Sequence, residues 1–224
     1  KQCWEAYLAG KNCMLHAPTG SGKTYALWGG IMAEALNQKA APKGLNALWI
    51  TPLRALAVEI QQATQRMTSD LLPNQKIGLR TGDTSQAVRA KQKRTPPFGL
   101  VTTPESWHVL LSTKDHQKYF HQLQVVVVDE WHELLGTKRG VQVELAVAYL
   151  RSFLPHLKVW GISATLGNKA LAQEILLGKG TNHQTVEAQI QKKIKVQSLL
   201  PKSMERFPWR GHLGLHLLRQ VLRI

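Results

Sequence analysis

The sequence predicts an α/β protein in which a parallel sheet is covered by helices on both faces. Short apolar runs rich in β-branched residues alternate with longer segments of helical periodicity, which is typical of strands joined by crossover helices. Proline directly follows two of these runs, at Pro52 and Pro104, where a first-turn proline costs no helix hydrogen bond. With 43% hydrophobic residues among 224, the chain can bury one large core.

The predicted elements follow one another in a regular order. The chain starts inside an amphipathic helix, and the predicted strands are 12–16, 45–51, 76–80, 99–103, 123–129 and 158–163. Helices are predicted to begin near Lys23, Pro52, Thr84, Pro104, Gly140 and Asn168. After Gly180 the pattern weakens to a loose strand-like alternation over 185–199 and a last helix-like run. We therefore expect one domain over 1–180 and a linker over 181–224.

The charge of the chain indicates a polyanionic partner. Lys and Arg number 29 against 14 Asp and Glu, which gives a net charge of +15 and favours nucleic acid or an acidic membrane surface. The longest purely aliphatic run, 125–128, is far shorter than the roughly 20 residues that span a bilayer, so no membrane-spanning segment is expected. Two cysteines, Cys3 and Cys13, predict neither a disulfide scaffold nor a zinc site and favour a reduced cytosolic setting.

The strongest local signal is a glycine-rich loop between a predicted strand and a predicted helix. Residues 17–24 read Ala-Pro-Thr-Gly-Ser-Gly-Lys-Thr, and such a loop cradles phosphate oxygens with backbone N–H groups at a helix N-terminus. Lys23 would reach the β and γ phosphates of ATP, and the Thr24 hydroxyl would hold Mg²⁺. Ala17 departs from the usual glycine, and the alternative is a glycine-rich turn without a ligand. The predicted nucleotide-binding residues are Thr19, Gly20, Ser21, Gly22, Lys23 and Thr24.

A pair of carboxylates follows the four-valine run at 125–128. Such a run predicts a fully buried strand, whose carboxyl end is where this class of sheet places its ligand. Asp129 would hold the hydrated Mg²⁺, and Glu130 would orient and deprotonate the attacking water. Alone, an Asp-Glu pair after a strand is more often a solvated edge. Together with the loop it predicts a catalytic set of Glu130, Asp129 and Lys23.

The two nucleotide motifs at 17–24 and 129–132 resemble those of superfamily-two helicases of the DExH type. Further matches follow in the family's order at 51–57, 81–83, 102–106 and 163–165. The segments 131–140 and 163–168, with the tail around 199–209, look like the large-helicase-related branch and most closely its ligase-associated DNA helicases. The resemblance implies a RecA-like P-loop domain that drives translocation on single-stranded DNA, 3′ to 5′, with ATP and Mg²⁺. It also implies bacterial DNA repair in the nucleoid-associated cytoplasm, with a DNA ligase and a nuclease as partners.

The resemblance also implies roles for residues at strand ends and helix starts. There, hydroxyls, backbone N–H groups and guanidinium groups can grip phosphates without reading sequence. Individually, a Thr or Ser before a helix is more often a cap, and the basic runs at 89–94 and 192–195 are more often solvated faces. The buried core is the commoner place for the tryptophans, with Trp131 left open between core and base stacking. The implied nucleic-acid-binding residues are Thr51, Arg54, Thr81, Gly82, Asp83, Thr102, Thr103, Ser106, Lys138 and Arg139, and His132, Ser163 and Thr165 would couple them to the nucleotide.

Part of such a motor lies outside this sequence. Relatives place ATP between two RecA-like domains, the second of which supplies arginine fingers in a Gln-x-x-Gly-Arg-x-Gly-Arg motif, and no such run occurs here. An arginine finger contributes roughly 10³ to 10⁵ in rate, so this piece is expected to bind nucleotide and hydrolyse it poorly. Two alternatives stay open: an RNA helicase motor domain, since backbone-gripping motifs do not show whether a 2′-hydroxyl is read, and a nucleic-acid-binding module with a vestigial nucleotide site.

Overall fold

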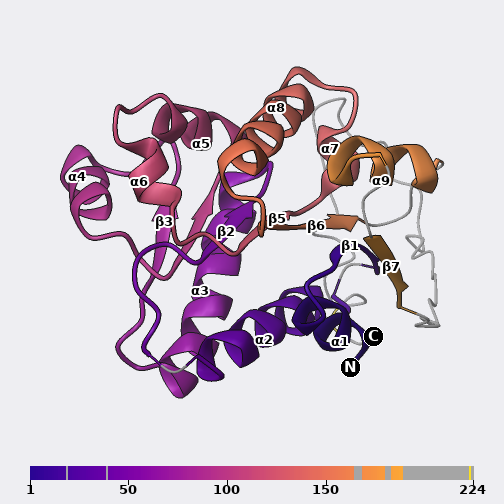
Figure 1. The fold of residues 1–224 in the computed structure, drawn as a ribbon, viewed down its shortest axis with the longest axis horizontal. Coiled ribbons are helices and arrows are strands. Elements are labelled where there is room, and N and C mark those ends of the chain that lie inside the picture. The colour runs from indigo at the N-terminus through magenta and orange to yellow at the C-terminus, as the bar shows by residue number, and fades with distance from the viewer. Residues whose placement is uncertain (19, 39, 164–167, 180–182, 189–221, 223–224) are drawn as a thin grey trace, which may run out of the picture. The chain divides into compact units, whose positions relative to one another are not determined.

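The computed structural model describes residues 1–18, 20–38, 40–163, 168–179, 183–188 and 222. Its centre is a seven-stranded sheet in the order β3-β4-β2-β5-β6-β1-β7 (Figure 1). All strand pairs are parallel. The strands are β1 (Asn12–His16), β2 (Ala47–Ile50), β3 (Ile77–Arg80), β4 (Gly99–Thr102), β5 (Val125–Val128), β6 (Lys158–Ser163) and β7 (His183–Glu187).

Helices cover both faces of the sheet, as the sequence predicts. In Figure 1, α1, α2 and α3 lie below the sheet, and α5, α8 and α9 lie above it. The helices are α1 (Gln2–Leu8), α2 (Lys23–Leu36), α3 (Arg54–Leu71), α4 (Gln86–Arg94), α5 (Pro104–Leu111), α6 (His116–Phe120), α7 (Trp131–Leu134), α8 (Lys138–Phe153) and α9 (Lys169–Leu177). None of these helices, within the described part of the chain, is both long and apolar enough to cross a bilayer.

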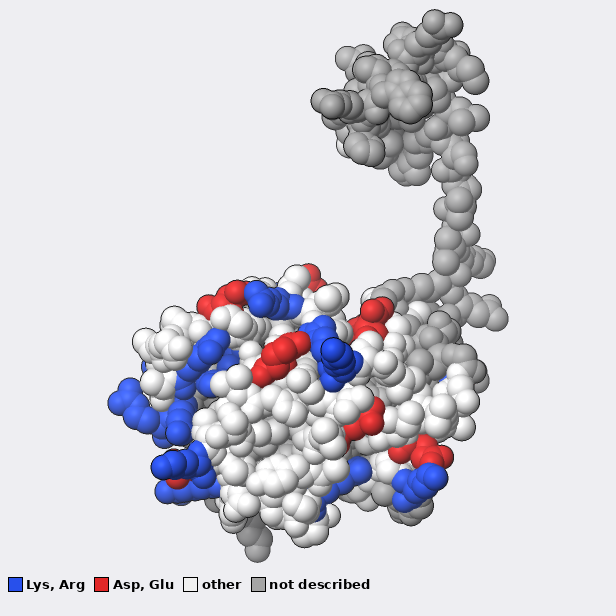
Figure 2. Space-filling view, turned by 90° about the horizontal axis from the view of Figure 1, so that it is seen from above, with Lys and Arg blue, Asp and Glu red and all other residues white. Residues whose placement is uncertain are grey.

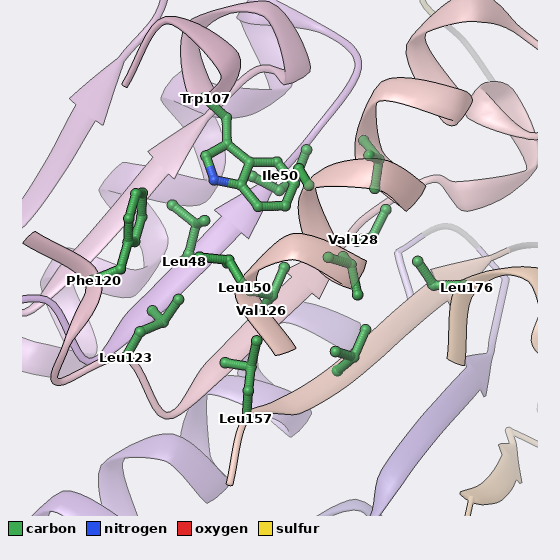
Figure 3. Packing of buried hydrophobic residues seen from close by; sticks show 14 of the residues in the cluster. Leu48, Ile50, Trp107, Phe120, Leu123, Val126, Val128, Leu150, Leu157 and Leu176 are labelled. Atoms are coloured by element: carbon green, nitrogen blue, oxygen red, sulfur yellow. The ribbon is translucent and has the colours of Figure 1, made fainter. Parts of the chain in front are cut away.

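The core is built on the alternation of side chains along the central strands. Val126 and Val128 of β5 point into the upper layer, where they pack with Leu48, Ile50 and Leu150 (Figure 3). Val125 and Val127 belong to the lower layer with Trp49 and Trp28. All four valines are completely buried, because β5 lies between β2 and β6 and helices close both of its faces. The prediction of a fully buried strand is confirmed.

Most predicted elements are confirmed, with differences at the boundaries. Pro104 is the first residue of α5, as expected. Pro52 lies in a bend two residues before α3, whose N-cap is the extended residue Leu53, so its predicted first-turn position is wrong. The short helices α6 and α7 were not predicted, because their apolar residues are too few to show a period. The compact unit that contains the sheet includes β7, which pairs with β1, and the domain boundary expected at residue 180 stays a prediction.

The edge strand β3 is closed by side chains rather than by another strand. Gln61 donates to the Ile77 carbonyl at 2.9 Å, and the Ile77 N–H donates to Gln65 at 2.8 Å. On the same edge, Gln92 donates to the Leu79 carbonyl at 3.0 Å. Three backbone groups of β3 are therefore occupied by glutamines of α3 and α4, which reduces the usual template for strand addition.

Two buried glycines give a test of how tightly the upper layer packs. A Cβ on Gly140 would lie 2.2 Å from the Leu134 carbonyl oxygen, which is backbone, whereas a Cβ on Gly161 would meet the ends of the Met14 and Leu176 side chains at 2.6 and 2.7 Å. Overpacking a core costs about 1–3 kcal/mol. We expect Gly140→Ala to lower the free energy of unfolding by about 3 kcal/mol and Gly161→Ala by about 1, measured by urea denaturation. Equal losses would show that the contact between α7 and α8 can relax.

Candidate functional site: a nucleotide pocket beside a strand-end rim

The predicted functional residues converge because every strand is parallel. The loop of 17–24 follows β1, Asp129 follows β5, Ser163 ends β6, and Thr51, Thr81 and Thr102 mark the ends of β2, β3 and β4. The carboxyl ends of parallel strands share one edge of the sheet, where folds of this class bind their ligands. We refer to this edge as the strand-end rim.

The phosphate-binding loop has the backbone shape that its glycines predict. Gly20 and Gly22 have φ of 70° and 78°, in the left-handed region that glycine adopts without strain, and Gly22 is the N-cap of α2. The Lys23 side chain is 11% exposed, and neither its Nζ nor the Ser21 hydroxyl has a hydrogen-bond partner among the described residues. Buried donors without partners are costly, and phosphate oxygens would satisfy both. Thr19 lies outside the described residues.

Asp129 is buried and held in one orientation. Its side chain accepts hydrogen bonds from the Glu130 N–H at 2.9 Å and from the Trp49 indole at 3.3 Å. Burial, and then the neighbouring Glu130 charge, raise the pKa of Asp129 to about 6. Because a bound cation favours the charged form, Mg²⁺ would reverse this shift. Trp49 was missed by sequence reasoning, since only the pairing of β2 with β5 brings it to Asp129.

Glu130 has the one left-handed backbone conformation among the described non-glycine residues, with φ of 48° and ψ of 45°. Such a conformation costs about 1–3 kcal/mol and persists where surrounding structure enforces it, often at functional sites. It places one carboxylate oxygen 3.6 Å from Lys23 Nζ and the other 3.4 Å from His132 Nδ1. The carboxylate therefore faces the Lys23 ammonium group inside the pocket.

His132 and Ser163 connect the carboxylate to the loop, in the positions predicted for coupling. The Ser163 hydroxyl lies 3.3 Å from His132 Nδ1, and the Ser163 carbonyl accepts from the Ala17 N–H at 3.3 Å. Ser163 is completely buried. The end of β6 thus contacts both nucleotide motifs, so a shift in one can reach the other. Thr165 lies outside the described residues.

These groups open into a pocket of about 670 Å³, large enough for a nucleotide. Lys23, Thr24, Asp129 and Glu130 line this pocket together with residues of α3 between positions 56 and 66, which sequence reasoning did not assign. The α3 residues are Leu56, Glu59, Ile60, Gln62, Ala63 and Arg66. No cluster of three or more His, Cys, Asp or Glu able to hold a metal occurs in the described part of the chain. Asp129 and Thr24 both line the pocket and carry oxygen atoms of the kind that hold Mg²⁺ together with substrate phosphates.

The predicted nucleic-acid residues divide into exposed and buried groups. Thr51, Thr81, Thr102, Thr103 and Ser106 are each less than 9% exposed. The Thr102 hydroxyl donates to the Arg80 carbonyl at 2.6 Å, and Thr81 accepts weakly from the Asp83 N–H. The Thr51 hydroxyl has no partner among the described residues. These side chains shape the rim, and the exposed groups on it are Arg54, Gly82, Asp83 and Lys138.

Two of the predicted basic contacts are paired with carboxylates of the same chain. Arg54 binds Asp83 through Nη1 at 2.9 and 3.2 Å, with both side chains largely exposed. Arg139 binds Glu105 at 2.6 Å and also donates to the Pro52 carbonyl at 2.8 Å. The rim is therefore less positive than its sequence suggests, and such exposed pairs contribute little to stability.

The structure places the basic residues of α4 and the side chain of Trp131 in different environments. Lys91, Lys93 and Arg94 form the last turn of α4, and Figure 2 shows Lys and Arg gathered toward that end of the upper face. Trp131 is completely buried and donates to the Ala172 carbonyl at 2.9 Å, so it is a core residue that anchors α9. The basic run at 192–195 lies outside the described residues.

Comparison with known proteins identifies the family to which this site belongs. Residues 1–173 match the family model of the DEAD/DEAH box helicase. The chain belongs to the DEAD/DEAH box helicase family. It is similar to the ATP-dependent helicase Lhr-Core of Sulfolobus acidocaldarius, with 31% identity over 86% of this chain and 23% of that protein. It is also 31% identical to the Lhr helicase/uracil glycosylase of Escherichia coli over 74% of this chain and 12% of that protein. The chain thus spans about a quarter or less of these helicases.

Solved helicase structures share the fold. The structure of Mycobacterium smegmatis helicase Lhr bound to ssDNA and AMP-PNP has 29% identity and a TM-score of 0.71, covering 84% of this chain and 25% of that one. The DEAD-box helicase Mss116 bound to ssRNA and UDP-BeF has a TM-score of 0.73 at 22% identity, over 83% of this chain and 39% of that one. The α/β class, the all-parallel sheet and the RecA-like helicase domain predicted from the sequence are confirmed.

The buried carboxyl of Asp129 gives a prediction about pH. Because its pKa is about 6 in the folded protein and about 4 when unfolded, the folded state keeps a proton that the unfolded chain releases between those values. Stability therefore falls as pH rises through this window. In protein free of nucleotide and Mg²⁺, we expect Asp129→Asn to raise the free energy of unfolding at neutral pH by about 3 kcal/mol, with the difference vanishing below about pH 4. Asp70→Asn, on the exposed end of α3, is the control, and a difference independent of pH would contradict the assigned cause.

Proposed function

We propose that this chain is the first RecA-like motor domain of an ATP-dependent DNA helicase that grips single-stranded DNA along the strand-end rim. The observation that supports this most is the convergence of Lys23, Asp129 and Glu130 on one pocket. His132 and Ser163 then lead from that pocket into the sheet. The membership in the helicase family and the DNA-bound Lhr structure support the assignment to a nucleic-acid motor.

The mechanism follows from the positions of these side chains. Lys23 and the N–H groups of the loop and of the first turn of α2 bind the phosphates. Asp129 and Thr24 would hold Mg²⁺, which would supply positive charge to neutralise the phosphates. Glu130 accepts a proton from the attacking water, and its contact with Lys23 keeps it directed at the terminal phosphate. Charge stabilisation by arginine fingers has to come from a second RecA-like domain, so this chain alone binds ATP and hydrolyses it slowly.

The finer biological assignment is also part of the proposal. We infer that the helicase moves 3′ to 5′ and acts in bacterial DNA repair with a DNA ligase and a nuclease, in the cytoplasm at the nucleoid. The support is the resemblance of 131–140 and 163–168 to ligase-associated DNA helicases. The residues assigned to the nucleotide pocket keep the roles described above.

The role of Glu130 can be tested in the full-length protein. We expect Glu130→Gln to lower the DNA-stimulated ATPase kcat by about 10² to 10⁴, because a general base contributes that much, with the affinity for a labelled ATP analogue retained. Steady-state hydrolysis with and without single-stranded DNA, together with equilibrium nucleotide binding, measures both quantities.

A neighbouring glutamate supplies the matched control. Glu133 lies three residues away on α7 and contacts the other ring nitrogen of His132 at 3.5 Å, but its side chain is 63% exposed. Glu133→Gln should leave turnover within about threefold of the wild type, since it removes the same charge outside the pocket. Undiminished turnover in Glu130→Gln would sink the catalytic assignment, and failure of the wild type to bind the analogue would favour a vestigial nucleotide site.

The choice between DNA and RNA needs a direct comparison. We expect single-stranded DNA to raise the ATPase rate more than RNA of equal length and sequence. Salt must be matched, because phosphate-dominated binding changes steeply with ionic strength. Equal or stronger stimulation by RNA would replace the DNA proposal with an RNA helicase.

A further inference from the structure

Arg139 belongs to a basic pair, Lys138-Arg139, whose two side chains lie in different environments. Lys138 is exposed at the first position of α8. Arg139 is 36% exposed, with Nε 2.6 Å from Glu105 and Nη2 2.8 Å from the Pro52 carbonyl. Both residues resemble phosphate contacts in the sequence, but the charge of Arg139 is paired with Glu105 of the same chain.

The contacts of Arg139 join three strand ends. Pro52 follows β2, Glu105 is the second residue of α5 after β4, and Arg139 stands in the first turn of α8, which follows β5 and the short helix α7. These strands are neighbours in the order β4-β2-β5. One planar guanidinium therefore spans two segments of the rim that carry predicted strand contacts, and the fork of donors on Arg fixes both distance and angle.

The start of α8 is itself held firmly. The Thr137 hydroxyl donates to the Leu134 carbonyl at 2.6 Å and accepts from the Gly140 N–H at 3.1 Å. Gly140 lets the helix approach the Leu134 carbonyl so closely that no side chain fits. The backbone that carries Arg139 is therefore held in place by the contacts between the start of α8 and α7, whose N-cap is Glu130.

The charge on Arg139 is already matched. Partial burial raises the pKa of the Glu105 carboxyl, but its own N–H, the Arg139 guanidinium and Thr103 outweigh burial and hold the pKa below its usual value. Glu105 is therefore ionised at neutral pH and neutralises Arg139. A phosphate would have to compete with this carboxylate and with the Pro52 carbonyl.

We propose that Arg139 is a positioning residue, which holds the Pro52 segment and the start of α5 at a fixed spacing, while Lys138 makes the phosphate contact. This inference rests on the proposed function, since it concerns how the rim binds a strand. In the sequence, Lys138 and Arg139 look like one basic contact. In this proposal Arg139 has a structural role and Lys138 binds the phosphate.

The test measures the affinity of the full-length protein for single-stranded DNA over a range of salt, with a non-hydrolysable ATP analogue bound. For Lys138→Gln we expect weaker binding and a salt slope smaller by about one, which marks a lost phosphate contact. For Arg139→Lys, which keeps the charge and loses the fork, we expect binding about tenfold weaker with the slope unchanged. Glu105→Gln should weaken binding similarly, and the double variant Glu105→Gln with Arg139→Gln should bind no worse than Arg139→Gln alone.

The opposite pattern would overturn the inference. If Arg139 bound phosphate, Arg139→Lys would bind nearly as well as the wild type, Arg139→Gln would reduce the slope by about one, and Glu105→Gln would strengthen binding. Unchanged affinity for the ATP analogue shows that each variant is folded. Failure of the wild type to bind single-stranded DNA would refute the proposed function and is distinguishable from either pattern.

Discussion

The placement of β5 between β2 and β6 is the constraint on which the rest of the site depends. The four valines of β5 are fully buried, and the strand is paired along both of its edges. Its carboxyl end therefore lies at the rim, beside the ends of its neighbours. Asp129 and Glu130 follow immediately. Their burial, the indole hydrogen bond from Trp49 and the approach of Lys23 all follow from that register. The pairing of Val128 with Ile50 and Gly161 places Asp129 directly beyond the last paired residue of β5, whereas four identical valines buried on both faces would not by themselves select this register.

The sequence was sufficient for the strands, the phosphate-binding loop and both carboxylates, because those signals are local. Each of these signals can be interpreted from a few neighbouring residues: a run of valines, a lysine preceded by two glycines, and a proline after a strand. Trp49, the α3 wall of the pocket and the pairing of Arg139 with Pro52 could not be predicted, since each depends on which strands are neighbours. Arg139 contacts Pro52 and Glu105, which lie 87 and 34 positions from it in the chain, and no rule of sequence spacing connects them. The left-handed conformation of Glu130 is similarly invisible, because glutamate rarely adopts it.

Part of the net charge of +15 lies in the described residues, where it is not concentrated on the strand-end rim. On the rim, Arg54 and Arg139 are matched by Asp83 and Glu105, whereas much of the visible positive charge gathers toward α4. The arrangement separates long-range attraction from close contact. Basic residues around α4 can attract a polyanion from a distance, while Arg54 and Arg139 on the rim are already paired with carboxylates.

The glutamines along β3 have a consequence for how this domain forms. A parallel sheet folds slowly, because the chain loses conformational entropy in bringing distant strands together before their pairing stabilises it. During that time an open outer strand is the natural place for two partly formed copies to join. Gln61 and Gln65 come from α3, which precedes β3 directly, and Gln92 from α4, which follows it, so all three reach the strand by local folding. We infer that these side chains cover the strand during folding as well, so that replacing them would lower the yield of folded protein more than its final stability.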